Sequence, residues 1–228
     1  MTPRHAVLLV GSPRGNASAS RILGQRLLAG LASRGLSVET HSIQSAAFTP
    51  AKEESMLEAA LTADLLVFAF PLYVDQLPAP VVRFLELLAA RRTANPVGTK
   101  PLLATIVQCG FPETLQNQPA VDIMRRFAEL NDFTWAGALA LGMGGAAGVK
   151  LPETPTGMLR NVVRAIDEAT EALSQGQPVP PDTSSLMGQP LMPRWLYLAV
   201  ANWRWKATAR KTARRKGRTV DLSARPYA

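Results

Sequence analysis

The sequence predicts an α/β protein: a three-layer, doubly wound, five-stranded parallel sheet with a C-terminal helical extension. Two patterns support this prediction. Short apolar segments alternate with stretches of helical periodicity over residues 5–175. Apart from a weaker, half-exposed strand at 36–43, the apolar segments lack the polar alternation of half-exposed strands. Strands this apolar suit a sheet that helices cover on both faces, which means parallel strands joined by crossover helices.

Five strand–helix units account for this part of the chain. The segment DLLVFAF (64–70) is the clearest strand, and the next segment places Val81, Phe84, Leu85 and Leu88 at helical spacing. The expected strands are 6–10, 36–43, 64–70, 102–107 and 135–142, and the expected helices are 18–34, 53–62, 78–92, 119–131 and 155–174.

Composition changes after the last of these helices. Residues 176–193 carry five prolines and two glycines, which is typical of a linker or an extended strap. Residues 194–228 resume a helical pattern that is rich in Trp, Lys and Arg. We therefore expect a ligand-binding domain over 1–175, a Pro-rich linker over 176–193 and a basic helix and tail over 194–228.

Few classes of cofactor site are open to this sequence. The single cysteine, Cys109, excludes an intramolecular disulfide framework and Cys-based zinc or iron–sulfur clusters. His5 and His41 have no metal-ligand spacing, so we expect no metal site. We see no signal-peptide pattern and no apolar run long enough to cross a membrane, and the expected compartment is the cytoplasm.

The net charge of +8 belongs to the C-terminal segment. Residues 1–193 hold 15 Lys and Arg against 16 Asp and Glu, whereas residues 194–228 hold 10 Lys and Arg against Asp221 alone. Any interaction with a polyanion would therefore depend on the tail.

The turn GSPRGNASAS (11–20) lies between the first strand and the first helix. Ligands of open α/β sheets bind at the carboxyl ends of the strands, and a helix start favours anions. Gly11 and Gly15 let the backbone bend closely around such a group. A plain helix cap would need only one of the polar residues. The candidate phosphate ligands are Ser12, Arg14, Asn16, Ser18 and Ser20.

Three more turns on the same predicted edge have unusual composition: PLYVDQLPAP (71–80), CGFPETLQNQ (109–118) and GMGGAAG (142–148). The first turn is neither a Walker A loop nor a G-x-G-x-x-G motif, so neither an NTPase nor a dinucleotide-binding half is indicated. Simpler interpretations remain for each of the others: a proline-rich entry to a helix, a surface carboxylate at Asp75, a small buried residue at Cys109 and a plain turn at 142–145.

On these motifs and their spacing, the sequence resembles the flavodoxin-like NAD(P)H-dependent FMN reductases over about residues 5–175. The resemblance implies strand order 2-1-3-4-5 and noncovalent FMN, with its phosphate on the five polar residues of the first turn. It places the isoalloxazine ring against Pro71, Leu72, Tyr73 and Val74, with Gly110 and Phe111 closing the other side. It also implies a homodimer.

The function expected from this resemblance is hydride transfer from NADH or NADPH to FMN. Electrons would then pass to a small acceptor such as a free flavin, a quinone, or a nitro or azo compound. No catalytic side chain is required, because the flavin carries the chemistry. The alternatives are a flavodoxin-type electron carrier that oxidises NAD(P)H poorly, and a regulatory or scaffold protein that has lost the flavin.

Three interpretations are open for the tail. It could be a helix packed on the body or on a partner subunit, with a solvated charged end. It could be an amphipathic helix at an anionic membrane surface through residues 194–218, which would put the protein at the inner face of the membrane. Nucleic acid is the least favoured partner, because no recognition motif accompanies the basic run.

Overall fold

The computed structural model of the chain describes residues 2–15, 18–46, 49–94, 100–147, 151–215, 217, 219 and 221. The chain divides into two compact units, Met1–Leu191 and Met192–Ala228.

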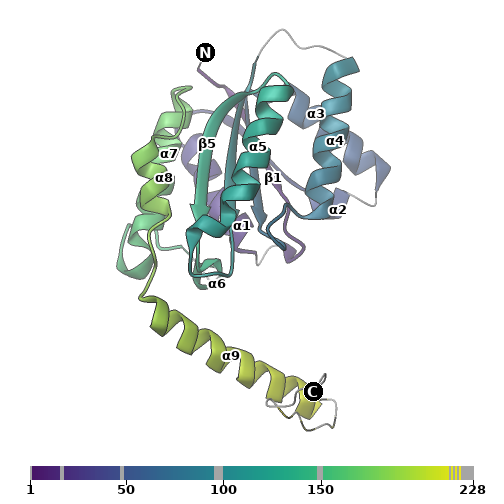
Figure 1. Cartoon of the computed structure of the whole chain (residues 1–228). Helices are drawn as coiled ribbons and strands as arrows, with labels where there is room; N and C mark the ends of the chain where they lie inside the picture. The colour runs from purple at the N-terminus through teal and green to yellow at the C-terminus, as the bar shows by residue number, and fades with distance from the viewer. Residues whose placement is uncertain are drawn as a thin grey trace. The chain divides into compact units, whose positions relative to one another are not determined.

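The first unit is built on a five-stranded parallel sheet (Figure 1). Its order is β2-β1-β3-β4-β5, which confirms the predicted fold class and strand order. The strands are β1 (His5–Val10), β2 (Ser37–Ser42), β3 (Leu65–Pro71), β4 (Leu102–Gln108) and β5 (Thr134–Leu141).

The burial of each strand follows its place in this order. All seven residues of the central strand β3 are buried, as its unbroken apolar sequence requires. Strand β2 forms one edge of the sheet, and none of its six residues is fully buried. The mixed polar composition of SVETHS is therefore tolerated there.

Helices cover both faces of the sheet. Helices α1 (Ala19–Ala32) and α7 (Arg160–Ser174) share one hydrophobic cluster with the sheet. Helices α3 (Pro50–Thr62), α4 (Ala79–Ala94) and α5 (Gln118–Leu130) share the cluster on the other face. The result is a three-layer α/β/α arrangement.

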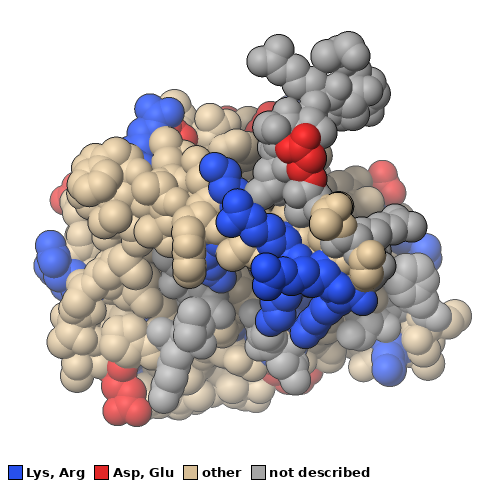
Figure 2. Space-filling model, turned by 90° about the horizontal axis from the view of Figure 1, so that it is seen from below, with Lys and Arg blue, Asp and Glu red and all other residues tan. Residues whose placement is uncertain are grey.

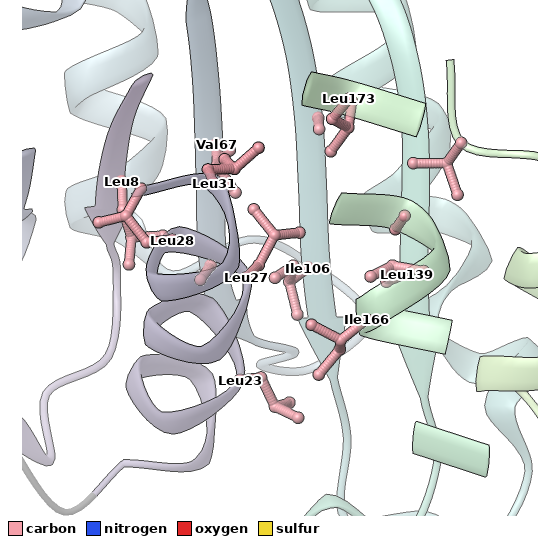
Figure 3. Packing of buried hydrophobic residues seen from close by; sticks show 14 of the residues in the cluster. Leu8, Leu23, Leu27, Leu28, Leu31, Val67, Ile106, Leu139, Ile166 and Leu173 are labelled. Carbon is pink, nitrogen blue, oxygen red and sulfur yellow. The ribbon is translucent and has the colours of Figure 1, made fainter. Parts of the chain in front are cut away.

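Figure 3 shows the cluster beneath α1 and α7. Leu23 and Leu27 of α1 approach Ile106 of β4 and Ile166 of α7, and all four are essentially inaccessible to solvent. Burying a side chain of this size stabilises the fold by about 1.5–3 kcal/mol. This packing fixes the position of α1 against the sheet, and so it fixes the position of the turn that precedes α1.

The last predicted helix starts later than the periodicity suggests. We expected it from residue 155, but α7 begins at Arg160 after a 3₁₀ turn, Gly157–Leu159. Gly157 explains the delay, because its φ of +61° lies outside the right-handed helical region. Two short helices, α2 (Ile43–Ala46) and α6 (Gly144–Ala147), were not predicted.

Residues within the predicted linker also form a helix, α8 (Pro181–Met187), which starts with Pro181 at its first position. The Val179 N–H donates to Ala136 O at 2.8 Å, and the Ser184 hydroxyl donates to Ala138 O at 2.9 Å. Met187 is fully buried. This segment therefore covers the outer edge of β5, which would otherwise expose unpaired backbone groups.

The second unit consists mainly of helix α9 (Arg194–Arg215). No side chain of this helix is buried. Among the described residues, no helix has the length and hydropathy needed to cross a membrane.

Candidate functional site

Four turns lie at the carboxyl edge of the sheet, after β1, β3, β4 and β5. Backbone hydrogen bonds at this edge join β1 to β3 and β3 to β4. The Gly11 N–H after β1 donates to Ala69 O of β3 at 2.9 Å, and the Leu72 N–H after β3 donates to Gln108 O of β4 at 2.8 Å. Strands β1 and β3 are neighbours although β2 lies between them in sequence. The chain order therefore reverses here, which is where ligands of doubly wound sheets bind.

The first turn wraps around the start of α1. Ser18 is the N-cap, and its hydroxyl oxygen accepts from the Arg21 N–H at 3.2 Å. The Ser12 hydroxyl oxygen accepts from the Arg14 N–H at 3.4 Å, and Gly15 has a φ of +58° that favours glycine. This arrangement directs the first N–H groups of the helix toward the carboxyl edge of β1.

Two predicted phosphate ligands in this turn fit an anion. Ser20 is fully buried, and its hydroxyl has no hydrogen-bond partner among the described residues. An unsatisfied buried hydroxyl is costly, and an anion above the helix start would provide the missing partner. Arg14 is exposed at the same turn. Asn16, the fifth predicted ligand, lies outside the described residues.

Gly11 is required here by packing. A Cβ at this position would lie 2.2 Å from Cγ2 of Val81 and 3.1 Å from Cβ of Phe70. Val81 is fully buried on α4, so the backbone after β1 runs directly against the helix that follows β3. The first and second turns are thereby held side by side.

The second turn is a tight reversal at Tyr73–Gln76. The Tyr73 N–H donates to Gln76 O at 2.9 Å, and the Gln76 N–H donates to Tyr73 O at 3.0 Å. Both central residues have a left-handed backbone conformation, Val74 with a φ of +49° and Asp75 with a φ of +58°. A type I′ turn requires this pair of φ values and favours Asn or Gly. A β-branched Val in this conformation is strained, and such strain concentrates at functional sites.

We expect Val74→Gly to stabilise the protein without ligand. Releasing the strain of the left-handed backbone should raise the free energy of unfolding by about 1–2 kcal/mol. The greater chain entropy of glycine in the unfolded state should lower it by about 0.5–1 kcal/mol. The net gain corresponds to a rise in Tm of about 1–4 °C, measured by thermal unfolding followed by circular dichroism. Val74→Ala keeps the Cβ and is the control, with a smaller change. A Val74→Gly protein that melts below the wild type would show that the turn is unstrained.

The second and third turns together present apolar surface. Pro71 and Leu72 are buried, but Tyr73 is 44% exposed, Val74 is 95% exposed and Phe111, after β4, is 53% exposed. These side chains lie at adjacent strands of one edge. Exposed apolar groups beside a helix-start turn fit a ligand with a flat apolar part and a charged end.

The third and fourth turns are tied to each other. The Met143 N–H donates to Phe111 O at 2.7 Å, and the Gly144 N–H donates to Cys109 O at 2.8 Å. Gly110, also predicted to lie at the ring, is exposed between these two bonds. The backbone that carries Phe111 is therefore held by the chain after β5.

Cys109 is a structural residue in this arrangement. It is 2% exposed, and burial raises the pKa of its thiol above the ordinary value. A protonated, enclosed thiol is a poor nucleophile.

Sequence reasoning missed two residues that position the third turn. Asn117 is fully buried, and its amide nitrogen donates to Thr114 O at 3.1 Å and to Leu141 O at 3.2 Å. The Thr114 hydroxyl donates to Gly188 O at 2.8 Å and accepts from the Gly142 N–H at 3.1 Å. Both lie in the polar run TLQNQ after Phe111, which was the only available signal.

Strand β2 and helix α3 line a cavity of about 320 Å³. Its lining includes the His41 and Thr40 side chains of β2 and Lys52 and Ser55 of α3. Within the described ranges, no cluster of His, Cys, Asp or Glu could hold a metal ion.

Comparisons with known proteins agree with this fold. A family model described as a flavodoxin-like fold matches residues 4–106. No curated protein sequence matches the chain. Among solved structures, an NADH:FMN oxidoreductase in its apo form is 17% identical with a TM-score of 0.54, over 84% of this chain and 97% of that chain.

Two further structures are similar over most of their length. An NAD(P)H:quinone oxidoreductase from Methanothermobacter marburgensis is 16% identical with a TM-score of 0.53, over 76% of this chain and 96% of that chain. A flavodoxin of Streptococcus pneumonia TIGR4 is 17% identical with a TM-score of 0.51, over 75% and 97%. At such identities the likeness concerns the fold, and the chain has a flavodoxin-like fold.

Proposed function

We propose that this protein is a flavodoxin-like NAD(P)H-dependent FMN reductase that binds FMN noncovalently at the carboxyl edge of its sheet. One observation carries the proposal: a helix-start turn with an unsatisfied buried hydroxyl at Ser20 lies next to the exposed apolar side chains of Tyr73, Val74 and Phe111. FMN has the same two parts, a phosphate and a flat ring system.

In this proposal the first turn holds the phosphate. Arg14 supplies a charge-assisted hydrogen bond, and the hydroxyls of Ser12, Ser18 and Ser20 supply neutral donors together with Asn16. The helix start adds its partial positive charge.

The second and third turns hold the ring. Pro71, Leu72, Tyr73 and Val74 provide apolar contact and backbone groups for the polar edge of the ring, and Gly110 and Phe111 close the opposite side. The strained reversal at Val74 fixes the direction of these backbone groups before the ligand arrives, which lowers the ordering cost of binding.

Bound FMN would supply the capacity to accept a hydride from NADH or NADPH and to pass electrons to a small flavin, quinone, nitro or azo acceptor. The protein residues need not move a proton in the first half-reaction, and the raised pKa keeps Cys109 out of the chemistry. Residues 1–175 form the FMN-binding domain in this proposal, and the working form is a cytoplasmic homodimer.

The test is the absorbance spectrum of the purified protein, followed by anaerobic titration with NADH and with NADPH. We expect the visible band of oxidised flavin, bleached within the mixing time by one of the two nicotinamides. A flavodoxin-type carrier would show the band but bleach slowly with both. A colourless protein that takes up no added FMN would contradict the proposal.

A further inference from the structure

Helix α9 differs from the long helices of the first unit because none of its side chains is buried. Trp195, Trp203 and Trp205 are 71%, 70% and 81% exposed, and Leu198 and Val200 are 41% and 42% exposed. A helix of 22 residues is about 33 Å long. Exposed apolar surface of this extent is typical of a binding surface.

The two halves of the helix have different chemistry. Between Trp195 and Trp203 the sequence WLYLAVANW contains no charged residue, and Asn202 is its only amide side chain. From Arg204 to Arg215, six of the twelve residues are Lys or Arg and none is acidic. Figure 2 shows these basic side chains gathered in one run.

The second half is two-sided. At about 100° per residue, its six basic residues fall on one side of the helix, and Trp205 and Ala209 fall on the other. Trp195 and Leu198 of the first half lie on the same side as Trp205. One mainly apolar stripe, defined by Trp195, Leu198, Trp205 and Ala209 and interrupted by Asn202, therefore runs along the helix. Leu196, Val200, Trp203 and Ala207 share a different face, which coincides with the basic side in the second half of the helix.

We infer that α9 is a binding surface for anionic lipid bilayers, with this stripe in the interface and the basic side at the headgroups. Charge complementarity argues for this partner, because residues 194–228 carry 10 Lys and Arg against one acidic residue. Tryptophan is enriched where water meets lipid, and an amphipathic basic helix lies in that plane. The segment Trp195–Trp203 contains no charged residue, so it can lie deeper in the interface than the basic half of the helix.

The inference is independent of the flavin and is tested on the full-length protein without cofactor. Three of the four tryptophans of the chain lie in α9, so intrinsic fluorescence reports mainly on this helix. We expect a blue shift of the emission with vesicles of phosphatidylcholine and phosphatidylglycerol. Flotation should recover the protein with these vesicles, weakly with phosphatidylcholine alone, and less at high salt.

Neutralising the basic side should weaken binding strongly. Each Lys or Arg near the surface contributes about fivefold, so four changes to Gln should reduce affinity by about 100-fold or more. The matched control removes the same charge from exposed positions of the first unit and should bind as the wild type. The test variant combines Arg210→Gln, Lys211→Gln, Arg214→Gln and Arg215→Gln, and the control combines Arg83→Gln, Arg125→Gln, Arg126→Gln and Arg164→Gln.

A second pair of variants tests the stripe. Trp203 and Trp205 are about 200° apart around the helix and are similarly exposed. We expect Trp205→Ala to weaken vesicle binding by about tenfold and Trp203→Ala to have a smaller effect.

Three results would overturn the inference. Emission that is already blue-shifted and unchanged by vesicles would show that the helix is covered by its own chain. Self-association in ultracentrifugation that disappears in Trp205→Ala, without vesicle binding, would assign the surface to a second copy. A shift with poly(U) RNA and none with anionic vesicles would assign it to nucleic acid.

Discussion

Replacing Arg14 with alanine is expected to weaken FMN binding by about 10- to 100-fold, which is the loss of one charge-assisted hydrogen bond. Arg14 is exposed, and no hydrogen bond or ion pair of its guanidinium is formed with the other described residues. The stability of the apoprotein should therefore stay within about 0.5 kcal/mol of the wild type. Fluorescence titration of the apoprotein with FMN measures the first effect and thermal unfolding measures the second.

Ser18→Ala is expected to lower both FMN affinity and the stability of the apoprotein, unlike Arg14→Ala. Its hydroxyl caps α1, so the apoprotein should lose about 0.5–2 kcal/mol of stability in addition to FMN affinity. The double variant should retain no flavin through purification.

Two controls separate the site from general effects. Arg164→Ala removes an exposed arginine from α7, and Ser33→Ala removes a serine from the opposite end of α1. Both should bind FMN as the wild type does. Unchanged FMN affinity in Arg14→Ala together with Ser18→Ala would place the phosphate site elsewhere.

Gly11→Ala is expected to destabilise the protein by about 1–3 kcal/mol, because overpacking a buried contact forces side chains or backbone to move. The new Cβ would lie 2.2 Å from Cγ2 of Val81, a branched side chain held in the core. To relieve this clash, the backbone must move the turn that carries Ser12 and Arg14 away from the start of α4. Flavin affinity should fall with stability, as measured by urea unfolding and FMN titration.

A double-mutant cycle identifies the contact responsible. Val81→Ala alone should cost about 2 kcal/mol by leaving a cavity. Combined with Gly11→Ala it should cost at least about 1 kcal/mol less than the sum of the two, because the added methyl occupies that space. Gly145→Ala is the control, since a Cβ there meets nothing within 4 Å. Additive losses would show that the clash with Val81 is not the cause.

The fold was predictable because its signals are local. Five apolar segments separated by helical periodicity gave the strands and most helix bounds to within a few residues, and β3 with its seven buried residues is the strongest case. The helix α7 and the covering helix α8 were predicted less well. Their bounds depend on Gly157 and on the free edge of β5, which a one-dimensional pattern does not contain.

Some features of the candidate site could also be predicted from the sequence, and others could not. The turn residues Ser12 to Ser20 and Tyr73 could be singled out because polar, glycine and aromatic residues were concentrated after apolar strands. The left-handed backbone of Val74 and the buried hydrogen bonds of Asn117 could not be predicted, because both arise from contacts between segments distant in sequence.

The sequence by itself determined the fold class, the sheet edge that carries the unusual turns and the uneven distribution of charge. Hydrophobic periodicity and composition are properties of short segments, so they can be recognised without knowing which segments are in contact in the folded protein. Only the tertiary structure decided that Gly11 packs against Val81 and that the Ser20 hydroxyl is buried without a partner among the described residues. These features depend on which atoms meet in space, and that is set when the sheet and its helices pack together.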